Sequence, residues 1–179
     1  IGAVSDPGAD TRSSYTITWG DGLSDTFTAA EWTAAAGSFT HTYADGPGNA
    51  TITVSTTDED GSFTLGTQAV TIANVAPSAS VSGAATVAEG SLYTLTVGPI
   101  TDPGADTRSA YTIAWGDGLS DSFTAAEWTA AAGSFTHTYA DGPGNAVITV
   151  STTDEDGSFT LGTQEVTIAN VAPSASVSG

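Results

Sequence analysis

The fold of this chain is decided by Tyr15-Thr-Ile-Thr-Trp19-Gly-Asp-Gly22, where apolar and polar residues alternate up to a tight turn. Alternation with a period of two is typical of a β-strand with one buried face, and glycine flanking aspartate favours a turn. The same arrangement recurs from Tyr111 to Gly118. We therefore expect a chain built from short strands and tight turns.

The stretch lies in an internal repeat, because Trp19 and Trp115 are 96 positions apart and their surroundings keep the same offset. Residues 6–83 and 102–179 differ at only five positions. Such similarity implies tandem duplication, as part of a longer array. We predict a repeat over 1–74 that lacks its first two strands, a complete repeat over 75–170 and the start of a third over 171–179. An alternative is head-to-tail completion, in which the last strand of one chain fills the gap in the next.

The composition is strongly acidic, with 2 Lys and Arg residues against 20 Asp and Glu residues and a formal net charge of −18. Nucleic acid and anionic membranes are disfavoured as partners, because their phosphates would meet few cationic side chains. The chain has no cysteine, which excludes disulfides and thiolate zinc sites. No apolar run approaches the ~20 residues of a membrane span, so membrane insertion is not expected.

Seven segments of the complete repeat have the alternation and turn boundaries of strands: residues 77–81, 91–97, 111–115, 120–123, 135–139, 145–152 and 158–168. In the last segment, Leu161 and Val166 lie on opposite parities, so we predict a bulge or kink near Gly162. The pattern indicates an all-β fold, an antiparallel β-sandwich of immunoglobulin-like type in tandem repeats.

One short helix per repeat is predicted over 124–133, because Thr124 and Glu127 form a capping-box pattern before an alanine-rich run. Trp128 in this segment is expected to close one edge of the core. The five differing positions test the strand parity, and all fall on the outward side: 14, 18, 26, 51 and 69, against 110, 114, 122, 147 and 165. The predicted core is therefore identical in the two copies.

The repeat resembles the PKD (polycystic kidney disease) domain family over almost its whole length. The resemblance is carried by Asn74-Val-Ala-Pro77, Val87-Ala-Glu-Gly90, Trp115-Gly-Asp-Gly118, His137-Thr-Tyr139 and Thr153-Asp-Glu-Asp-Gly157. Two features depart from the family: Trp115 directly precedes Gly116 instead of an Asp-Phe pair, and the alanine-rich helix looks like an insertion. The resemblance implies a β-sandwich spacer of cell-surface or secreted proteins, several of which bind calcium.

An acidic cluster is predicted at one end of the repeat, where strand order brings two loops and the entering linker together. Its members are Asp102, Asp106, Asp154, Glu155, Asp156 and Asn74, with Asp6, Asp10, Asp58 and Asp60 at the matching places of the first copy. Calcium prefers six to eight oxygen ligands of this kind. The resemblance implies calcium ligands at Asn74, Asp102 and Asp154, and at Asp6 and Asp58. The alternative reading is a set of solvated turn carboxylates.

The Gly-Asp-Gly turn carries a second group of polar residues at the opposite end. We expect Asp117 to cap backbone amides of the turn, and His137 to be a hydrogen-bonded core residue because it shares the parity of Phe135 and Tyr139. Serine is abundant but lacks a nucleophile elbow, and the two histidines stand at equivalent places of separate copies. The sequence therefore predicts no enzyme.

These observations together predict a non-catalytic structural module of an extracellular or cell-surface repeat protein, such as a stalk, adhesin or filament, rigidified by calcium at domain junctions. Its expected partners are neighbouring repeats of the same protein, with self-assembly into fibres as a further prospect. The alternative is an adhesive binding module whose threonine-rich faces or Trp128 loop contact carbohydrate, ice or a neighbouring fibre.

Overall fold

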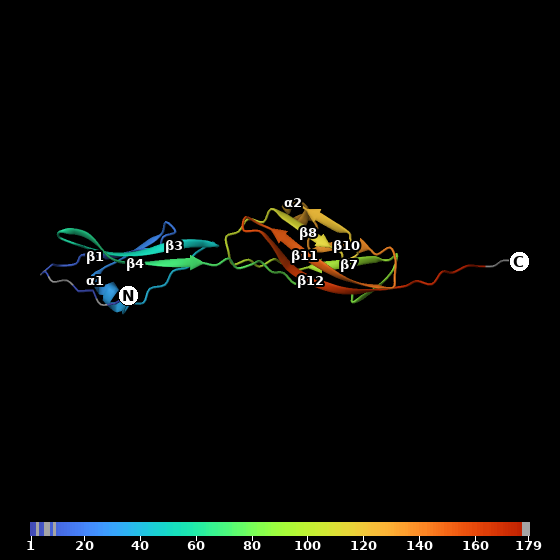
Figure 1. The fold of residues 1–179 in the computed structure, drawn as a ribbon, viewed down its shortest axis with the longest axis horizontal. Helices are drawn as coiled ribbons and strands as arrows, with labels where there is room; N and C mark the ends of the chain where they lie inside the picture. The colour runs from blue at the N-terminus through green and yellow to red at the C-terminus, as the bar shows by residue number, and fades with distance from the viewer. Residues whose placement is uncertain (3, 6–7, 9, 177–179) are drawn as a thin grey trace. The chain divides into compact units, whose positions relative to one another are not determined.

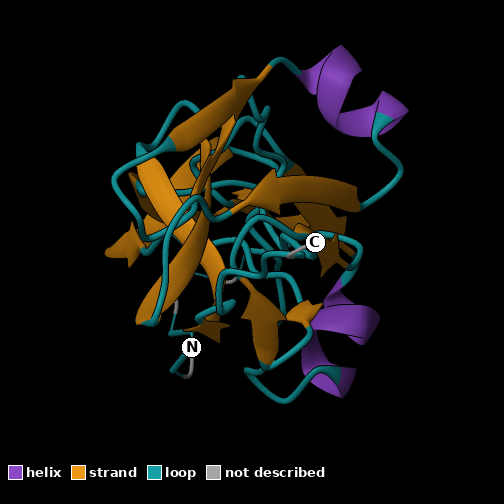
Figure 2. Cartoon of the chain, turned by 90° about the vertical axis from the view of Figure 1, so that its right-hand side faces the viewer, coloured by secondary structure: helices purple, strands orange, loops and turns teal. Residues whose placement is uncertain are grey.

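The structure, a computed structural model, describes residues 1–2, 4–5, 8 and 10–176 and divides the chain into two compact units, Ile1–Asn74 and Val75–Gly179 (Figure 1). Strands dominate the regular structure, with two short helices (Figure 2). The predicted all-β class is therefore confirmed. Within the described part of the chain, neither of the six-residue helices has the length and apolarity to cross a membrane.

The first unit contains one antiparallel sheet with strand order β2-β1-β3-β4. Its strands are β1 (Ser14–Thr18), β2 (Ser24–Phe27), β3 (Gly48–Asp58) and β4 (Gly61–Ile72), and α1 spans Ala29–Ala34. Ile17, Trp19 and Val54 form its buried apolar cluster, against which half-buried aromatic side chains pack. Most of this core comes from a single sheet, so one face of the cluster has no second sheet above it among the described residues.

The second unit contains two sheets. The three-stranded sheet has the order β10-β7-β5, with β5 (Val81–Gly83), β7 (Leu92–Val97) and β10 (Ser134–Thr138). The five-stranded sheet has the order β6-β12-β11-β8-β9, with β6 (Thr86–Ala88), β8 (Ala110–Ala114), β9 (Ser120–Phe123), β11 (Gly144–Thr153) and β12 (Ser158–Ala169). Helix α2 (Ala125–Ala130) follows β9.

Alternating side chains from both sheets build one core in the second unit, as the strand parity predicts. Its buried members are Tyr93, Leu95, Val97, Ile113, Trp115, Phe135, Tyr139, Ala146, Ile148, Val150, Leu161, Val166 and Ile168. Trp128 of α2 is half-buried against this cluster, in agreement with its predicted place at the edge. None of the five differing positions is buried in either copy, so the predicted outward parity is also confirmed.

The predicted capping box is present in both helices. In α2 the Thr124 hydroxyl accepts a hydrogen bond from the Glu127 backbone N–H, and the Glu127 carboxylate accepts one from the Thr124 N–H. The helix ends earlier than predicted, at Ala130. Ala132 and Gly133 have φ angles of 49° and 77°, and a left-handed backbone cannot continue a right-handed helix.

The predicted bulge is also present. The pairing of β11 with β12 shifts register between Val150 and Ser151, where Gly162 and Thr160 are the partners and Leu161 is the additional residue. The shift lets Leu161 and Val166 both face the core despite their opposite parities. The same shift occurs in the first unit between Val54 and Ser55.

Three expectations about strands are wrong. Residues 86–88 form β6, which pairs in parallel with β12, so the five-stranded sheet is mixed and not purely antiparallel. The first strand is β5 at Val81–Gly83, whereas the predicted range 77–81 contributes only an isolated bridge between Ser78 and Thr101. Residues 38–42 of the first unit form no strand, although their copy in the second unit is β10.

Residues 170–176 have no regular structure, and the rest of the predicted third repeat lies outside the described residues.

Candidate metal centre

Two loops of the second unit lie side by side at the end of the five-stranded sheet. One loop joins β7 to β8, and the other is the tight turn between β11 and β12. They are joined by a hydrogen bond of 2.8 Å from the Thr107 backbone N–H to Glu155 Oε2. The antiparallel pairing of β8 with β11 brings the start of one strand beside the end of the other. This pairing is the reason why residues about 50 positions apart meet here.

Asp154 is a buried carboxylate at the first position of the turn, with 7% of the residue exposed. Its Oδ1 accepts hydrogen bonds from the backbone N–H groups of Asp156, at 2.9 Å, and Gly157, at 3.1 Å. Its Oδ2 is buried and receives no hydrogen bond from any described residue. An acceptor left in this state costs about 1–3 kcal/mol, so a ligand that satisfied it would stabilise the fold.

The Asp102 carboxylate, like that of Asp154, has one oxygen with a hydrogen-bond donor and one without. Its side chain is 5% exposed, and its Oδ2 accepts a hydrogen bond of 3.1 Å from Arg108 Nη1. Its Oδ1 is buried without a hydrogen-bond donor among the described residues. Sequence reasoning assigned no role to Arg108. The sequence does contain a signal that Arg108 has a role. It is one of only two cationic residues other than histidine, and the two stand at equivalent places of the two copies.

The carboxylates of Asp106 and Asp156 approach one another, with an oxygen of each within 4.8 Å of the other. Both residues are half-buried. Ionised carboxylates at this distance repel one another. Of the four predicted ligands in the second unit, the structure brings together the carboxylates of Asp106 and Asp156. Carboxylate oxygens suit a hard cation such as calcium.

The first unit has the same turn with more exposed carboxylates. Asp58 Oδ1 accepts from the N–H groups of Asp60 and Gly61 at 2.9 and 3.2 Å, and the Thr11 N–H donates to Glu59 Oε2 at 3.0 Å. Asp58 is half-buried, whereas Asp60 and Asp10 are exposed. Asp6 lies outside the described residues, and Asn74 is half-buried at the end of the unit. The assignment of these residues as metal ligands stays a prediction.

The Gly-Asp-Gly turn of the second unit holds a compact polar group. Asp117 Oδ1 accepts from the Leu119 backbone N–H at 3.0 Å, which confirms the predicted amide cap. His137 Nε2 lies 2.7 Å from Asp117 Oδ2, and its ring stacks on Trp115 with centroids 4.7 Å apart. Tyr139 donates its hydroxyl to the Trp115 carbonyl at 3.0 Å. The histidine is thus the hydrogen-bonded core residue that the parity predicts.

Electrostatics at this turn favour the ionised aspartate. Burial raises the pKa of Asp117, but hydrogen bonds from His137 and from the Leu119 N–H outweigh burial and hold the pKa below its usual value. Asp21 also has a lowered pKa, chiefly through its hydrogen bond with His41. Asp121, on β9 near the same turn, accepts a hydrogen bond of 2.8 Å at its Oδ2 from the Trp115 indole N–H.

Comparison with known proteins gives no family for this chain, since no protein-family model matches it and a search of curated proteins finds no match. The resemblance to PKD domains therefore rests on the sequence motifs alone.

Proposed function

We propose that this chain is a non-catalytic structural module of an extracellular repeat protein, built from tandem PKD-like sandwiches of immunoglobulin type and stiffened by calcium. The observation that carries the proposal is the pair of buried carboxylate oxygens, Asp102 Oδ1 and Asp154 Oδ2, that lack hydrogen-bond donors among the described residues. Buried acceptors are rarely left without partners, and calcium, which is coordinated by oxygen ligands, would satisfy an acceptor of this kind.

The place of the cluster in the second unit suits a stiffening role. Asp102 follows Thr101, whose backbone N–H and C=O both bond to Ser78 at 2.9 Å. Ser78 lies three residues after Val75, where the second unit begins. An ion held by Asp102 would therefore fix the loop that is bonded to the entering segment. Near-identical copies suit a spacer, because length is the property that duplication adds.

The proposal excludes a catalytic role for the polar group at the Gly-Asp-Gly turn. His137 is held between the Asp117 carboxylate and the Trp115 ring, and its side chain is 10% exposed. Such contacts fix the ring as a structural element. The secreted location is proposed from the resemblance together with the composition, which lacks lysine and is rich in Ser, Thr, Ala and Gly.

The test is a thermal melt of the whole chain in 5 mM calcium and in excess chelator. Binding to the folded state alone stabilises it by RT ln(1 + [L]/Kd), which is roughly 2–3 kcal/mol if the site has the ~10⁻⁴ M affinity of extracellular calcium modules. We expect the midpoint to rise by several degrees, and Asp154→Asn to abolish the rise.

Glu165→Gln is the matched control, because it removes one negative charge from an exposed position of β12. The calcium response should survive in this variant. Superimposable melts of the wild-type chain with and without calcium would remove the ion from the proposed function.

A further inference from the structure

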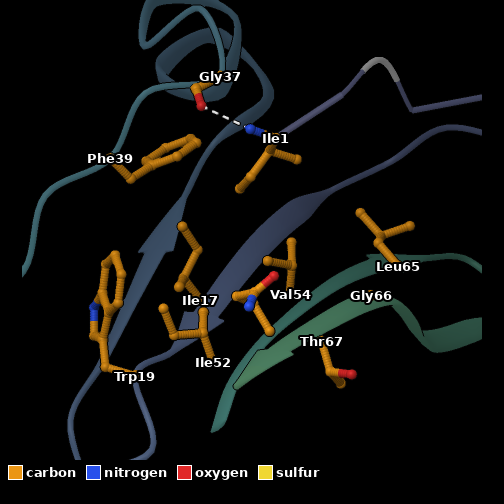
Figure 3. Close-up of a pocket in the computed structure, with 11 residues that line it drawn as sticks. Ile1, Ile17, Trp19, Gly37, Phe39, Ile52, Val54, Leu65, Gly66 and Thr67 are labelled. Carbon is orange, nitrogen blue, oxygen red and sulfur yellow. Dashed lines mark hydrogen bonds between the residues drawn. The ribbon is translucent and has the colours of Figure 1, made fainter. Parts of the chain in front are cut away.

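The last strand of each unit leads into the same four residues, Asn-Val-Ala-Pro, at 74–77 and 170–173. In the first unit this strand is β4, which borders a cavity of about 460 Å³. Figure 3 shows Leu65 and Gly66 of β4 beside this cavity, together with Ile52 of β3. In the second unit the last strand is β12, and the segment that follows it is held by a glutamate carboxylate.

The end of β12 is paired in parallel with β6, and the pairing stops at Ala88 and Ala169. In a parallel ladder every second residue donates its N–H to the neighbouring strand and accepts a hydrogen bond from that strand through its carbonyl oxygen. The carbonyl of Ala85 has this role, because it accepts a hydrogen bond of 2.9 Å from the Thr167 N–H. Two steps of two residues further along, the next position of this kind is Glu89, opposite residue 170.

Glu89 continues the ladder with its side chain in place of its backbone carbonyl. Its backbone N–H donates to the Ala169 carbonyl at 2.9 Å, as in a parallel pair. The Val171 N–H, which a continued ladder would direct at the Glu89 carbonyl, donates instead to Glu89 Oε1 at 2.7 Å. The main chain turns away at Gly90, where φ is 71°, a conformation that glycine adopts without strain. The carboxylate thus holds Val171 in a sheet-like position after the pairing of backbones has ended.

The second oxygen of the carboxylate joins a third segment to this contact. The Gly142 N–H, in the loop between β10 and β11, donates to Glu89 Oε2. A Cβ on Gly142 would lie 3.1 Å from Glu89 Oε2 and 3.1 Å from Ile168 Cγ2, so a side chain at this position would crowd the contact. One carboxylate therefore connects the turn after β6, the β10–β11 loop and the segment after β12.

The segment after β12 has the sequence of a linker, because the matching residues 74–77 contain the boundary between the two units. Residues 170–176 are exposed and have no regular structure, whereas Glu89 is half-buried. Hydrogen bonds to an ionised carboxylate are roughly twice as strong as those between neutral groups. Val171 is therefore the point at which the linker is bonded to the folded unit.

We propose that Glu89 is a clamp that fixes the backbone of Val171, and with it the path of the linker, on the second unit. The clamp gives the Glu of the Val87-Ala-Glu-Gly90 motif a role that the candidate metal centre does not involve. It consists of hydrogen bonds within the folded chain and needs no ion. The inference therefore goes beyond the proposed calcium stiffening and does not rest on it.

NMR of the whole chain in excess chelator tests the clamp. We expect the Val171 amide of the wild-type chain to exchange at least about tenfold more slowly than an unstructured amide, and Glu89→Ala to remove this protection. The {¹H}–¹⁵N heteronuclear NOE of Val171 should fall in the same variant, because the linker gains motion on the ps–ns timescale. Fast exchange of Val171 in the wild-type chain would overturn the proposal.

The Gly142 amide is an internal control for a local effect. In the first unit the equivalent Gly46 N–H donates to Asp45 Oδ1 at 2.8 Å, so the loop has an acceptor of its own, which is Asp141 in the second unit. Glu89→Ala should therefore affect Val171 more than Gly142. Equal loss of protection at both amides and throughout β11 would mean general destabilisation of the unit and would contradict a clamp.

Two further variants complete the experiment. Glu89→Gln keeps the length of the side chain but has one acceptor oxygen for two donors, so Val171 should show intermediate protection. Glu165→Ala is the control, because it removes the same charge from an exposed position of β12 and should leave Val171 as in the wild-type chain. Wild-type protection of Val171 in both Glu89 variants would refute the clamp, and it would leave the calcium-dependent melt of the proposed function untouched.

Discussion

The two units contain the same ten residues, Ala-Ala-Ala-Gly-Ser-Phe-Thr-His-Thr-Tyr, at 34–43 and 130–139, but the second half of this stretch differs in secondary structure. In the second unit Ser134–Thr138 form β10, and in the first unit residues 38–42 form no strand. The side-chain contacts are nevertheless alike: His41 stacks on Trp19 at 4.7 Å, as His137 does on Trp115. What differs is the partner, because β10 pairs only with β7. Strand formation here is set by the neighbouring strand and not by local sequence.

The units also differ in how completely water is excluded. Ile148 is 0% exposed in the second unit, whereas its copy, Ile52, is half-buried beside the cavity. Identical side chains on equivalent strands thus contribute unequally to the stability of their units, because apolar stabilisation is roughly proportional to the apolar area removed from water. The side chain and its strand position are the same in both units, so the difference in burial comes from the elements packed around it.

The largest expected difference is in amide exchange. Alternate amides of β10 bond to β7 and should exchange only when the second unit opens substantially, whereas amides of residues 38–42 should exchange in the native state. We expect protection to differ by roughly a thousandfold, measured by NMR-detected hydrogen exchange. Similar protection of the two segments would mean that the first unit gains a strand partner in solution, which dilution should then remove if the partner is a second copy.

The next largest effect is expected from truncating the paired isoleucines. Ile148→Ala should destabilise the second unit by about 2–5 kcal/mol, since it leaves a cavity in a closed core. Ile52→Ala should cost less than half of this, because solvent already reaches that face. Urea unfolding followed by circular dichroism measures both. Equal costs would contradict the difference in burial.

Much of the fold could be predicted from the sequence, because strand parity is a local property. The alternation of Tyr111, Ile113 and Trp115 gave the buried face of β8, and the change of parity after Leu161 gave the bulge. β6 could not be predicted in this way. Its three residues pair in parallel with β12, and a pairing between distant segments leaves no periodic signal in so short a stretch.

The candidate site could be predicted in part for the same reason. Turn chemistry and strand order placed the Asp102 loop beside the Asp154 turn, as the hydrogen bond between Thr107 and Glu155 shows. The ion pair of Arg108 with Asp102 and the indole bond to Asp121 were missed, because each depends on side-chain direction in three dimensions. The sequence around Arg108 and Asp121 contains no motif that indicates which side chain each of them contacts.

A smaller effect is expected at alkaline pH in the second unit. Burial, with a lesser contribution from the Asp117 charge, raises the pKa of Tyr139 to about 12. The unfolded tyrosine ionises near pH 10, so this contribution to stability is complete below pH 10 and is lost as the pH rises towards 12. We expect the free energy of unfolding of the second unit to fall by about 1 kcal/mol between pH 9 and 11. The second unit's transition is the one that Ile148→Ala shifts. Tyr139→Phe should reduce this loss without abolishing it, because burial also raises the pKa of Tyr93. An unchanged loss would assign it to another group.

The smallest effect concerns the feature in which the two units agree. Asp21 and Asp117 both have lowered pKa values and both contact a stacked histidine. A depressed pKa contributes stability above the unfolded value near 4, and the contribution is lost as the pH falls through the lower folded pKa. Asp21→Asn and Asp117→Asn should therefore lower the melting midpoint slightly at pH 7, and the difference from the wild-type chain should shrink below pH 4. Thermal melts at pH 7, 4 and 2.5 provide the measurement. Because the contacts are the same in both units, the two variants should behave alike. A clearly larger loss of stability for Asp117→Asn would mean that the three-stranded sheet of the second unit strengthens the Gly-Asp-Gly turn, which lies outside that sheet. The contact of Asp117 with His137 would then depend on neighbouring strands, as the formation of β10 does.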